Sequence, residues 1–272
     1  MPDCLLEKRD DGVAIITMNR PERMNAMSAE MRRLLVEYFE ACETDPRVRC
    51  VLLTGAGRAF CSGADVGGIK ERADTLDGAD RGQFALLQER VRALRARQNL
   101  AALRLHTMGK PTVAVINGPA IGVGFSYALA CDIRLMGDTA KVAAGFGNMA
   151  LPGDMGATYF LSKLVNTAVA RELCFTGEMV DAARALHLGL VNRVYAQDRL
   201  AEEALAYCAR LAAGPTLAYA GIKENLNFAW SASAQEALDF EAQNMIFASL
   251  GLDHKEAITA FVEKRRPRFT GT

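Results

Sequence analysis

The sequence predicts an α/β fold in which strands and helices alternate over about the first two thirds of the chain, with only helices after that. Two continuous apolar runs, Cys50–Thr54 and Thr112–Ile116, are typical of strands buried on both faces of a sheet. From Pro215 onward the apolar residues recur only at helical spacing. We therefore expect a core formed by residues 1–200 and a helical region formed by residues 201–272.

The N-terminal segment predicts a β-hairpin followed by a helix. Leu5–Lys8 and Val13–Met18 flank an Asp-Asp-Gly sequence, which favours a tight turn between two strands. Ser28 is a suitable N-cap residue for the amphipathic segment that follows it. Asp45-Pro46 ends this helix, because proline disfavours helical backbone at the residue before it.

The middle of the chain contains a polar stretch and then a long amphipathic segment. Val66–Gln83 is polar and rich in glycine, which is typical of a mobile lid. Phe84–Met108 has an apolar stripe that includes Leu87 and Val91, so it predicts a helix whose arginines face solvent. The remaining elements are expected as strands at 133–136, 141–144 and 190–195, and as helices at 155–164, 217–228, 234–250 and 255–264, with further helices beginning at Asp181 and Asp198.

Composition excludes several classes of protein. Lys and Arg number 32, as do Asp and Glu, so the basic excess of a nucleic-acid-binding protein is missing. No apolar run reaches the ~18 residues of a membrane-spanning helix, and the N-terminus does not resemble a signal peptide. The seven cysteines are scattered, without a C-x-x-C pair, which predicts reduced thiols and a cytoplasmic protein. No residue cluster has the spacing of metal ligands.

Two glycine-rich turns follow the two apolar strands. Gly55–Asp65 comes after the first strand, and Asn117–Asp132 comes after the second. Within the second turn, Phe125–Ala130 is apolar enough to form a helix that is buried all round. A glycine turn that leads into a helix presents unpaired N–H groups, which favour an anion or a developing oxyanion.

Other motifs around the second turn are incomplete. Gly122-Val123-Gly124 would need a third glycine at Tyr127 to form a dinucleotide-binding fingerprint. The sequence around Ser126 nearly matches a nucleophile elbow, but its last position is alanine and the three histidines are better explained as structural. Cys61, beside the first turn, is better explained as a small buried thiol than as a nucleophile.

Taken together, the motifs resemble those of the crotonase, or enoyl-CoA hydratase/isomerase, superfamily. Arg58–Asp65 and Ile116–Arg134 resemble its two oxyanion-hole motifs, and Asn19–Ser28 its N-terminal CoA-contact loop. Phe175–Val194 and Ala260–Arg265 resemble later signatures of the same superfamily. The resemblance implies a crotonase-like spiral of β-β-α units with a helical C-terminal trimerisation region. It also implies a homotrimer or a dimer of trimers.

The same resemblance implies an acyl-CoA substrate, with coenzyme A as part of the thioester and no prosthetic group. Reactions of this type pass through a thioester enolate, whose oxygen gains negative charge. By motif position the main-chain N–H groups of Ala64 and Val123 would hold that oxygen, and each such donor can contribute ~3 kcal/mol. Further positions match residues that contact CoA: Arg23, Met24, Ala26, Ala64, Asp65 and Val66 in one subunit, with Phe261 and Lys264 reaching the CoA of a neighbouring subunit.

The resemblance also indicates which side chain moves a proton. Hydratases of the superfamily use two glutamates, and the corresponding positions here are Ser126 and Phe146, neither of which is a carboxylate. The segment around Asp154 resembles that of single-aspartate isomerases, in which one aspartate takes a proton and returns it elsewhere. From the residues alone, the favoured role of Asp154 is the N-cap of the helix that begins near Met155, a role that is compatible with catalysis.

We therefore expect an enoyl-CoA isomerase in which Asp154 is the acid/base. Two alternatives remain open at this stage: an enoyl-CoA hydratase that uses Asp154 alone, and a catalytically silent CoA-binding protein. The acyl group is not specified by the sequence. Four aromatic residues allow an aromatic or medium-chain substrate without selecting one: Phe84, Phe125, Phe146 and Tyr159.

Overall fold

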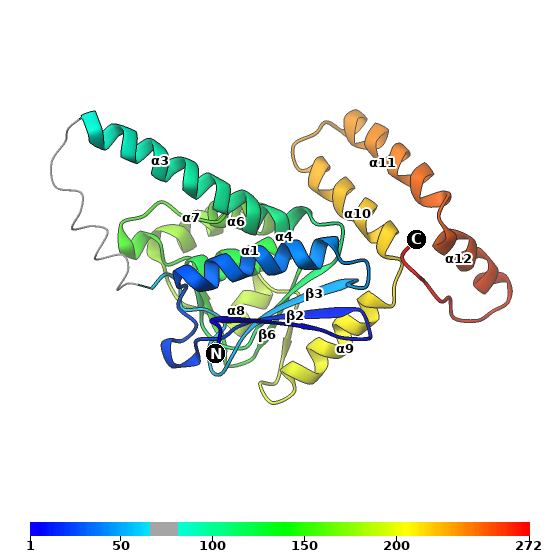
Figure 1. Ribbon diagram of the computed structural model, residues 1–272, viewed down its shortest axis with the longest axis horizontal. Coiled ribbons are helices and arrows are strands. Elements are labelled where there is room, and N and C mark those ends of the chain that lie inside the picture. Colours follow the sequence, from blue (N-terminus) through cyan, green and yellow to red (C-terminus); the bar gives the residue numbers. More distant parts are fainter. Residues whose placement is uncertain (66–80) are drawn as a thin grey trace.

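The computed structural model of the protein describes residues 1–65 and 81–272 (Figure 1). The expected lid, 66–83, therefore lies outside the described residues except for its last three positions, which begin helix α3. Val66, expected to contact CoA, lies outside them as well. Of the helices that are described, none is both long and apolar enough to cross a membrane.

A six-stranded sheet forms the centre of the molecule, in the order β1-β2-β3-β4-β6-β9. β1 runs antiparallel to β2, and each later neighbour in the sheet is parallel. A smaller sheet has the order β5-β7-β8. The bounds of the strands are β1 Cys4–Lys8, β2 Val13–Met18, β3 Cys50–Gly55, β4 Thr112–Ile116, β5 Ala120–Ile121, β6 Ile133–Gly137, β7 Lys141–Ala143, β8 Val180–Asp181 and β9 Arg193–Tyr195.

Both faces of the large sheet are covered, which explains why its central strands are apolar throughout. Val51 and Leu53 of β3 point into the main core, where α1 (Ala29–Thr44) and α5 (Val123–Ala130) pack. The alternate residue Leu52 points to the other face, against α9 (Leu200–Ala212). Figure 1 shows α1 and α9 on opposite sides of the strands. The predicted α/β core is confirmed.

Three helix starts test the expected caps. Ser28 caps α1 as predicted, because its side chain accepts a hydrogen bond from Met31 N at 3.0 Å. Asp181 likewise caps α8 (Ala182–His187). Asp198 lies one residue before the N-cap of α9, which is Arg199 and makes no side-chain cap.

Asp154 is not a helix cap, so that alternative for its role is wrong. The expected helix at 155–164 begins later, as α6 (Ala157–Leu164), and its N-cap is Gly156. Gly156 has a φ of 78°, a left-handed conformation that glycine adopts without steric cost. The backbone therefore turns between Asp154 and the helix, and the aspartate side chain is left for other contacts.

The long helix expected at 84–108 is present as three consecutive pieces. α3 (Arg81–Gln98) leads into a π-helical turn, Asn99–Leu103, and then into α4 (Arg104–Thr107). Its predicted apolar stripe is wrong in the first half, where Leu87 and Val91 are 48% and 44% exposed. The reason is geometric: the first half of α3 extends beyond the body of the molecule, so no core lies beneath it (Figure 1).

The C-terminal helices lie beside the sheet rather than over it (Figure 1). α10 (Thr216–Ala229) and α11 (Ala234–Ser249) pack as a helical hairpin, and α12 (Leu252–Val262) follows. Arg49, next to β3, ties the chain end to the core by donating to the main-chain oxygen of Phe269 at 2.8 Å. Among the described α-helices, one was not anticipated: α7 (Thr167–Thr176), which lies within an otherwise unassigned stretch.

Candidate active site

The two glycine turns lie against each other at the carboxyl ends of β3 and β4. Cys61 N donates to Pro119 O at 3.1 Å, and Ile121 N donates to Cys61 O at 2.9 Å. The side chain of Asn117 adds hydrogen bonds to the main-chain oxygens of Gly55 and Gly57, at 2.8 and 2.9 Å. Segments more than 55 residues apart in the chain are thus held together mainly through backbone atoms.

Glycine is required at two points of this contact because the chains approach so closely. A Cβ atom on Gly118 would lie 2.0 Å from Arg58 O, and one on Gly124 would lie 2.3 Å from Cys61 O. Both partners are backbone atoms, which cannot move aside without breaking the turn. The glycines of the second motif therefore set the spacing between the two turns.

A cavity of about 750 Å³ opens beside the paired turns. Ala64, Val123 and Asp154 all line it, so the structure brings the three expected catalytic residues together. Val123 is the first residue of α5, where helical geometry leaves the N–H without an intrahelical acceptor. Across the described part of the chain, no residue accepts a hydrogen bond from the N–H of either Ala64 or Val123. Both groups are available to a ligand.

Asp154 has its two carboxylate oxygens in different environments. Oδ1 accepts hydrogen bonds from Gln98 Nε2 at 2.9 Å and from Met155 N at 2.6 Å. Oδ2 accepts none from the described residues. Gln98 was not anticipated as a site residue, because a single amide in an arginine-rich helix carries no sequence signal.

Ser126 and Phe146, at the two positions where hydratases carry glutamates, take up other roles. Ser126 is fully buried, and its Oγ lies 3.0 Å from the main-chain oxygen of Asp154 and 3.1 Å from that of Gly122. A hydroxyl has one proton to donate, so Ser126 binds one of these oxygens at a time. Phe146 lines the cavity. The only carboxylate that lines the cavity, among the described residues, is Asp154.

The expected N-terminal CoA loop lies directly beside the first turn. Ser62 N donates to Met24 O at 3.0 Å, and Met27 N donates to Gly63 O at 2.8 Å. Met24 has a φ of 49°, so the loop makes a sharp bend here. Two other expected CoA contacts are Ala26, which is half-buried, and Arg23, which is exposed.

Asp65 is held in place from the same loop. Arg20 Nη1 bonds its carboxylate at 3.1 Å and also donates to Ala26 O at 2.7 Å. The guanidinium therefore joins the N-terminal loop to the end of the first turn.

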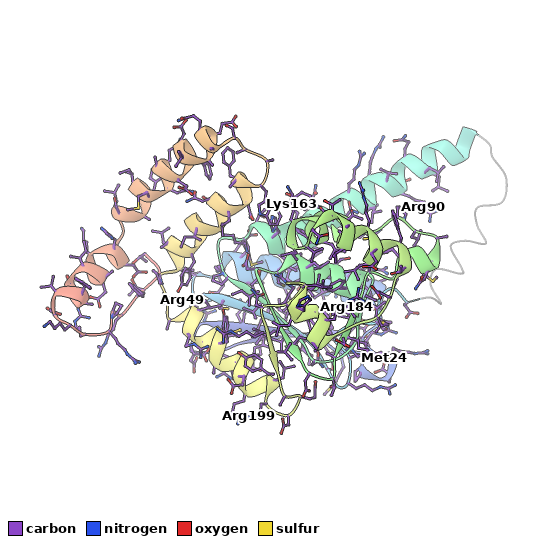
Figure 2. The ribbon with its side chains drawn as sticks, turned by 180° about the vertical axis from the view of Figure 1, so that it is seen from behind. Met24, Arg49, Arg90, Lys163, Arg184 and Arg199 are labelled. Carbon is purple, nitrogen blue, oxygen red and sulfur yellow. The ribbon has the colours of Figure 1, made fainter. Side chains whose placement is uncertain are left out.

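Phe261 and Lys264 lie away from the cavity of their own chain. α12, which carries Phe261, is at the end of the molecule opposite the N-terminal loop (Figures 1 and 2). Phe261 is 85% exposed, and Lys264 has a left-handed φ of 54° just beyond the helix. Within one chain these two residues cannot contact a ligand bound at the paired turns.

Two of the aromatic residues expected at the acyl group lie elsewhere. Tyr159 packs with His106 and Trp230, at ring separations of 6.4 and 5.5 Å, because α6 turns this face toward α10. Phe125 is buried in the core. The side chain of Phe84 lies outside the described residues. Tyr127, which was not expected, does line the cavity, and burial raises the pKa of its hydroxyl.

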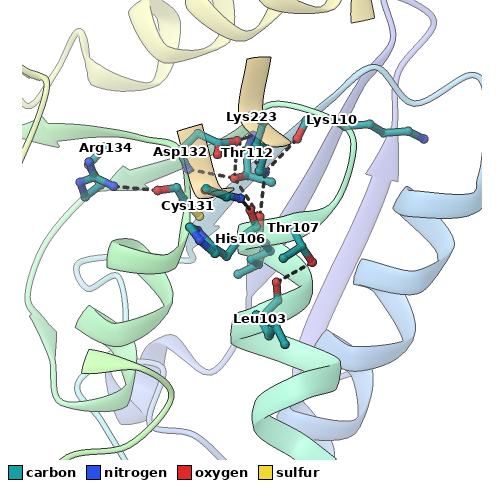
Figure 3. A network of polar contacts seen from close by, with 11 residues as sticks. Leu103, His106, Thr107, Lys110, Thr112, Cys131, Asp132, Arg134 and Lys223 are labelled. Carbon is teal, nitrogen blue, oxygen red and sulfur yellow. Dashed lines mark hydrogen bonds and ion pairs between the residues drawn. The ribbon is translucent and has the colours of Figure 1, made fainter. Parts of the chain in front are cut away.

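A second polar network, formed by residues that do not line the cavity, is structural (Figure 3). Lys223 of α10 donates to Asp132 Oδ2 at 2.9 Å and to Leu105 O at 3.0 Å. Thr112 donates to the same aspartate oxygen at 2.9 Å. The network joins α10 to the sheet, and the carboxylate of Asp132 already accepts hydrogen bonds from Lys223 and Thr112. Nearby, burial lowers the pKa of His106.

The cysteine beside the first turn is not poised for chemistry. Cys61 is fully buried, and burial raises the pKa of its thiol to about 11. A thiol with such a pKa is protonated at neutral pH and is a poor nucleophile. Over residues 1–65 and 81–272, no group of three or more His, Cys, Asp or Glu side chains is arranged to hold a metal ion.

Comparison with known proteins identifies the family of this chain. The sequence profile of the family described as "Enoyl-CoA hydratase/isomerase" matches residues 8–272. The 1,2-epoxyphenylacetyl-CoA isomerase of Escherichia coli K12 is 33% identical over 271 residues and is covered over its whole length, as is this chain. The short-chain-enoyl-CoA hydratase of Clostridium acetobutylicum is 32% identical, over 96% of this chain and 95% of that protein.

Solved structures of similar fold come from the same family. The crystal structure of an enoyl-CoA hydratase from Polaromonas sp. JS666 superposes with a TM-score of 0.88 at 28% identity, covering 98% of this chain and 99% of that one. This protein is therefore a member of the enoyl-CoA hydratase/isomerase family, within the crotonase superfamily, and it has the crotonase fold. The similar proteins include both isomerases and hydratases, so the particular reaction has to be argued from the site.

Proposed function

We propose that this protein is an enoyl-CoA isomerase that moves a proton, and with it a double bond, along the acyl chain of a CoA thioester. The observation that carries the proposal is that Asp154 is the single carboxylate lining the cavity among the described residues. It shares this cavity with the free N–H groups of Ala64 and Val123. One carboxylate and two oxyanion donors are sufficient for a 1,3-proton shift.

In the proposed reaction, Oδ2 of Asp154 takes a proton from the carbon next to the thioester carbonyl. The electrons of the broken C–H bond move into the carbonyl, and the enolate oxygen is held by the N–H groups of Ala64 and Val123. Asp154 then returns the same proton to the far end of the conjugated system. The double bond shifts, and no co-reactant is consumed.

Hydration would make different demands on this cavity. Water must be activated at one carbon while a proton is delivered to the other, which is easier with two acids. Ser126 and Phe146 supply neither of them. Ser126 instead donates toward the backbone that carries Asp154. A hydratase that uses Asp154 alone, and a silent CoA-binding protein, are the two alternatives that an experiment must separate.

The test is incubation of the purified protein with a panel of enoyl-CoAs in deuterated water. An isomerase gives products of shifted double-bond position and unchanged formula, because Asp154 returns the proton that it took. Deuterium enters these products only where that proton exchanges with solvent while the enolate is bound. A hydratase gives a product heavier by one water. A silent binder gives no product, although CoA still raises its melting temperature.

Asp154→Asn should abolish the isomerisation and leave the melting temperature nearly unchanged. A matched control is Asp10→Asn, in the exposed turn between β1 and β2, which should keep full activity. Full activity of the Asp154→Asn protein would rule out the proposed mechanism.

We further propose that the Ala64–Asp65 segment and the Arg23–Ala26 loop bind the CoA moiety, with Phe261 and Lys264 supplied by a neighbouring copy in a homotrimer or dimer of trimers. Three structural facts support this assembly: the loop lies against the first turn, α12 lies far from the cavity of its own chain, and α10–α12 expose many large apolar side chains. Exposed large apolar side chains in such number are typical of an interface between proteins.

A further inference from the structure

One wall of the active-site cavity is formed by arginines on helix α3. Arg90, Leu94 and Arg97 all line the cavity, and their spacing along the helix places them on one face. Arg32 of α1 lines it too, and its Nη2 also donates to Met27 O at 2.9 Å. Against these three arginines the described lining contains one acid, Asp154. Among the described residues, the side chains that line the proposed acyl cavity therefore include more basic than acidic groups.

Arg97 is the most informative member of this wall. Its Nε is buried without a hydrogen-bond partner, and neither Arg97 nor Arg90 forms an ion pair with a described residue. The sequence alone had suggested that both arginines face solvent; that expectation is wrong for Arg97, which is half-buried. A buried donor without an acceptor is costly, so it points to a ligand group that completes the site.

The position of the wall indicates which part of the substrate it meets. Gln98, the residue after Arg97, binds Asp154, so the wall lies next to the proposed acid/base. Arg90 precedes Arg97 on α3 and lies near the point where the N-terminal half of the helix extends beyond the body of the molecule (Figure 2). The proposed CoA-binding segments are formed by other elements, the N-terminal loop and the first turn. The arginines are thus placed for the acyl group beyond the reacting carbons.

We propose that the acyl group carries a carboxylate at the end remote from the thioester, and that Arg97, with Arg90, binds it. The substrate class is then an unsaturated dicarboxylic acid esterified to CoA through one of its two carboxyl groups. Guanidinium groups match carboxylates in charge and in two-donor geometry, whereas a fully apolar chain would desolvate Arg97 without compensation. The inference rests on the proposed function, because the proposed positions of CoA and of the reacting carbons define the direction in which the acyl chain runs.

The test measures binding rather than turnover, so it does not depend on the reaction. Isothermal titration compares adipoyl-CoA with hexanoyl-CoA, which have the same chain length and the same CoA phosphates and differ in the terminal carboxylate. We expect adipoyl-CoA to bind the native protein at least about tenfold more tightly. Arg97→Gln should remove most of this preference. Arg92→Gln, an exposed position on the same helix that does not line the cavity, should keep it.

Two results would overturn the inference. Equal affinity of the native protein for the two thioesters would show that no carboxylate subsite exists, and this comparison needs no variant to fold. An equal loss of affinity for both thioesters in Arg97→Gln would assign the arginine to the CoA phosphates. If the native protein prefers adipoyl-CoA but no enoyl-CoA reacts in deuterated water, the proposed reaction fails and the subsite stands.

Discussion

The side-chain amide of Gln98 donates a hydrogen bond of 2.9 Å to Oδ1 of Asp154, a residue 56 positions further along the chain. Met155 N donates to the same oxygen at 2.6 Å. Because Oδ1 accepts both hydrogen bonds, Oδ2 is the oxygen that we propose exchanges a proton with the substrate. Gln98 is the last residue of α3, immediately before the π-helical turn, a type of irregularity that is frequent at functional sites.

Replacing Gln98 with methionine, which has a similar shape and no donor, should lower kcat about 10- to 100-fold and change KM little. The reason is that a hydrogen bond to a charged group contributes about 1.5–3 kcal/mol, and here it orients the proposed base. Steady-state kinetics measures both parameters.

Gln88→Met is the matched control, since Gln88 is exposed on the same helix. It should have native kinetics. A Gln98→Met protein with native kcat would show that the hydrogen bond to Asp154 has no part in the reaction.

Val123→Pro removes one of the two proposed oxyanion donors and should reduce kcat about 10²–10³-fold. Proline is tolerated at the first position of a helix, which Val123 occupies in α5, so the fold should survive. Val123→Ala keeps the N–H and should keep most of the activity. The prediction fails if proline and alanine at this position give similar kcat values in proteins of similar melting temperature.

Ser126→Ala deletes the hydroxyl that donates to the main-chain oxygen of Asp154 or of Gly122, one at a time. Leaving a buried acceptor without its donor should lower the free energy of unfolding by about 1–2 kcal/mol, as measured by urea denaturation. Since the segment that carries Asp154 loses support, kcat should fall as well. Ser162→Ala, at an exposed hydroxyl on α6, should change neither quantity appreciably.

His106 should make the protein less stable in mild acid. Its ring is stacked on Trp230 at 5.0 Å, and burial holds its pKa below the ordinary value of 6.5. Between these two pKa values the unfolded chain binds more protons than the folded chain. The free energy of unfolding is therefore fully retained above about pH 6.5 and decreases as the pH falls below it.

The slope attributable to His106 should be smaller than about 1.4 kcal/mol per pH unit, because the ring is only half-buried. Urea denaturation of His106→Gln across this pH range should show a shallower slope than the native protein. His254→Gln, at an exposed position, should show the native slope. If the free energy of unfolding depends on pH with the same slope in the native protein and in His106→Gln, the loss of stability in acid does not come from His106.

The proposed assembly predicts a trimer or hexamer in sedimentation equilibrium. Ile246 and Phe247 of α11, and Val262 of α12, are exposed in the single chain and should be covered by a neighbouring copy. Phe247→Asp places a charge at this surface and should shift the protein toward monomers. Glu241→Gln, an exposed polar position on the same helix, should not. A monomeric native protein would contradict the assembly.

Local sequence signals predicted the core well, because they depend on neighbouring residues. Ser28 capped its helix, the apolar runs became central strands, and the glycines of the second motif fell where two backbones meet. The interpretation of Asp154 as a helix cap failed. An aspartate before a helix carries the same signal whether or not a glycine such as Gly156 turns the backbone between them.

Contacts between distant segments were not predictable. Nothing near Gln98 indicates that its amide reaches Asp154, and an arginine such as Arg97 has the same helical spacing whether water or a cavity faces it. The apolar stripe of α3 was correct in period, yet at Leu87 it had no core beneath it. Periodicity reports which residues share a face of a helix, and tertiary packing decides what that face meets.

The close approach of Gly118 and Gly124 to the first turn has a consequence for how new activities can arise on this scaffold. The groups proposed to hold the enolate belong to the peptide backbone, and their separation is fixed by backbone-to-backbone contact. Side chains at positions 126, 146 and 154 can therefore be exchanged without disturbing it. A lineage can change the proton-transfer chemistry one residue at a time, while the backbone groups proposed to stabilise the common intermediate are inherited intact.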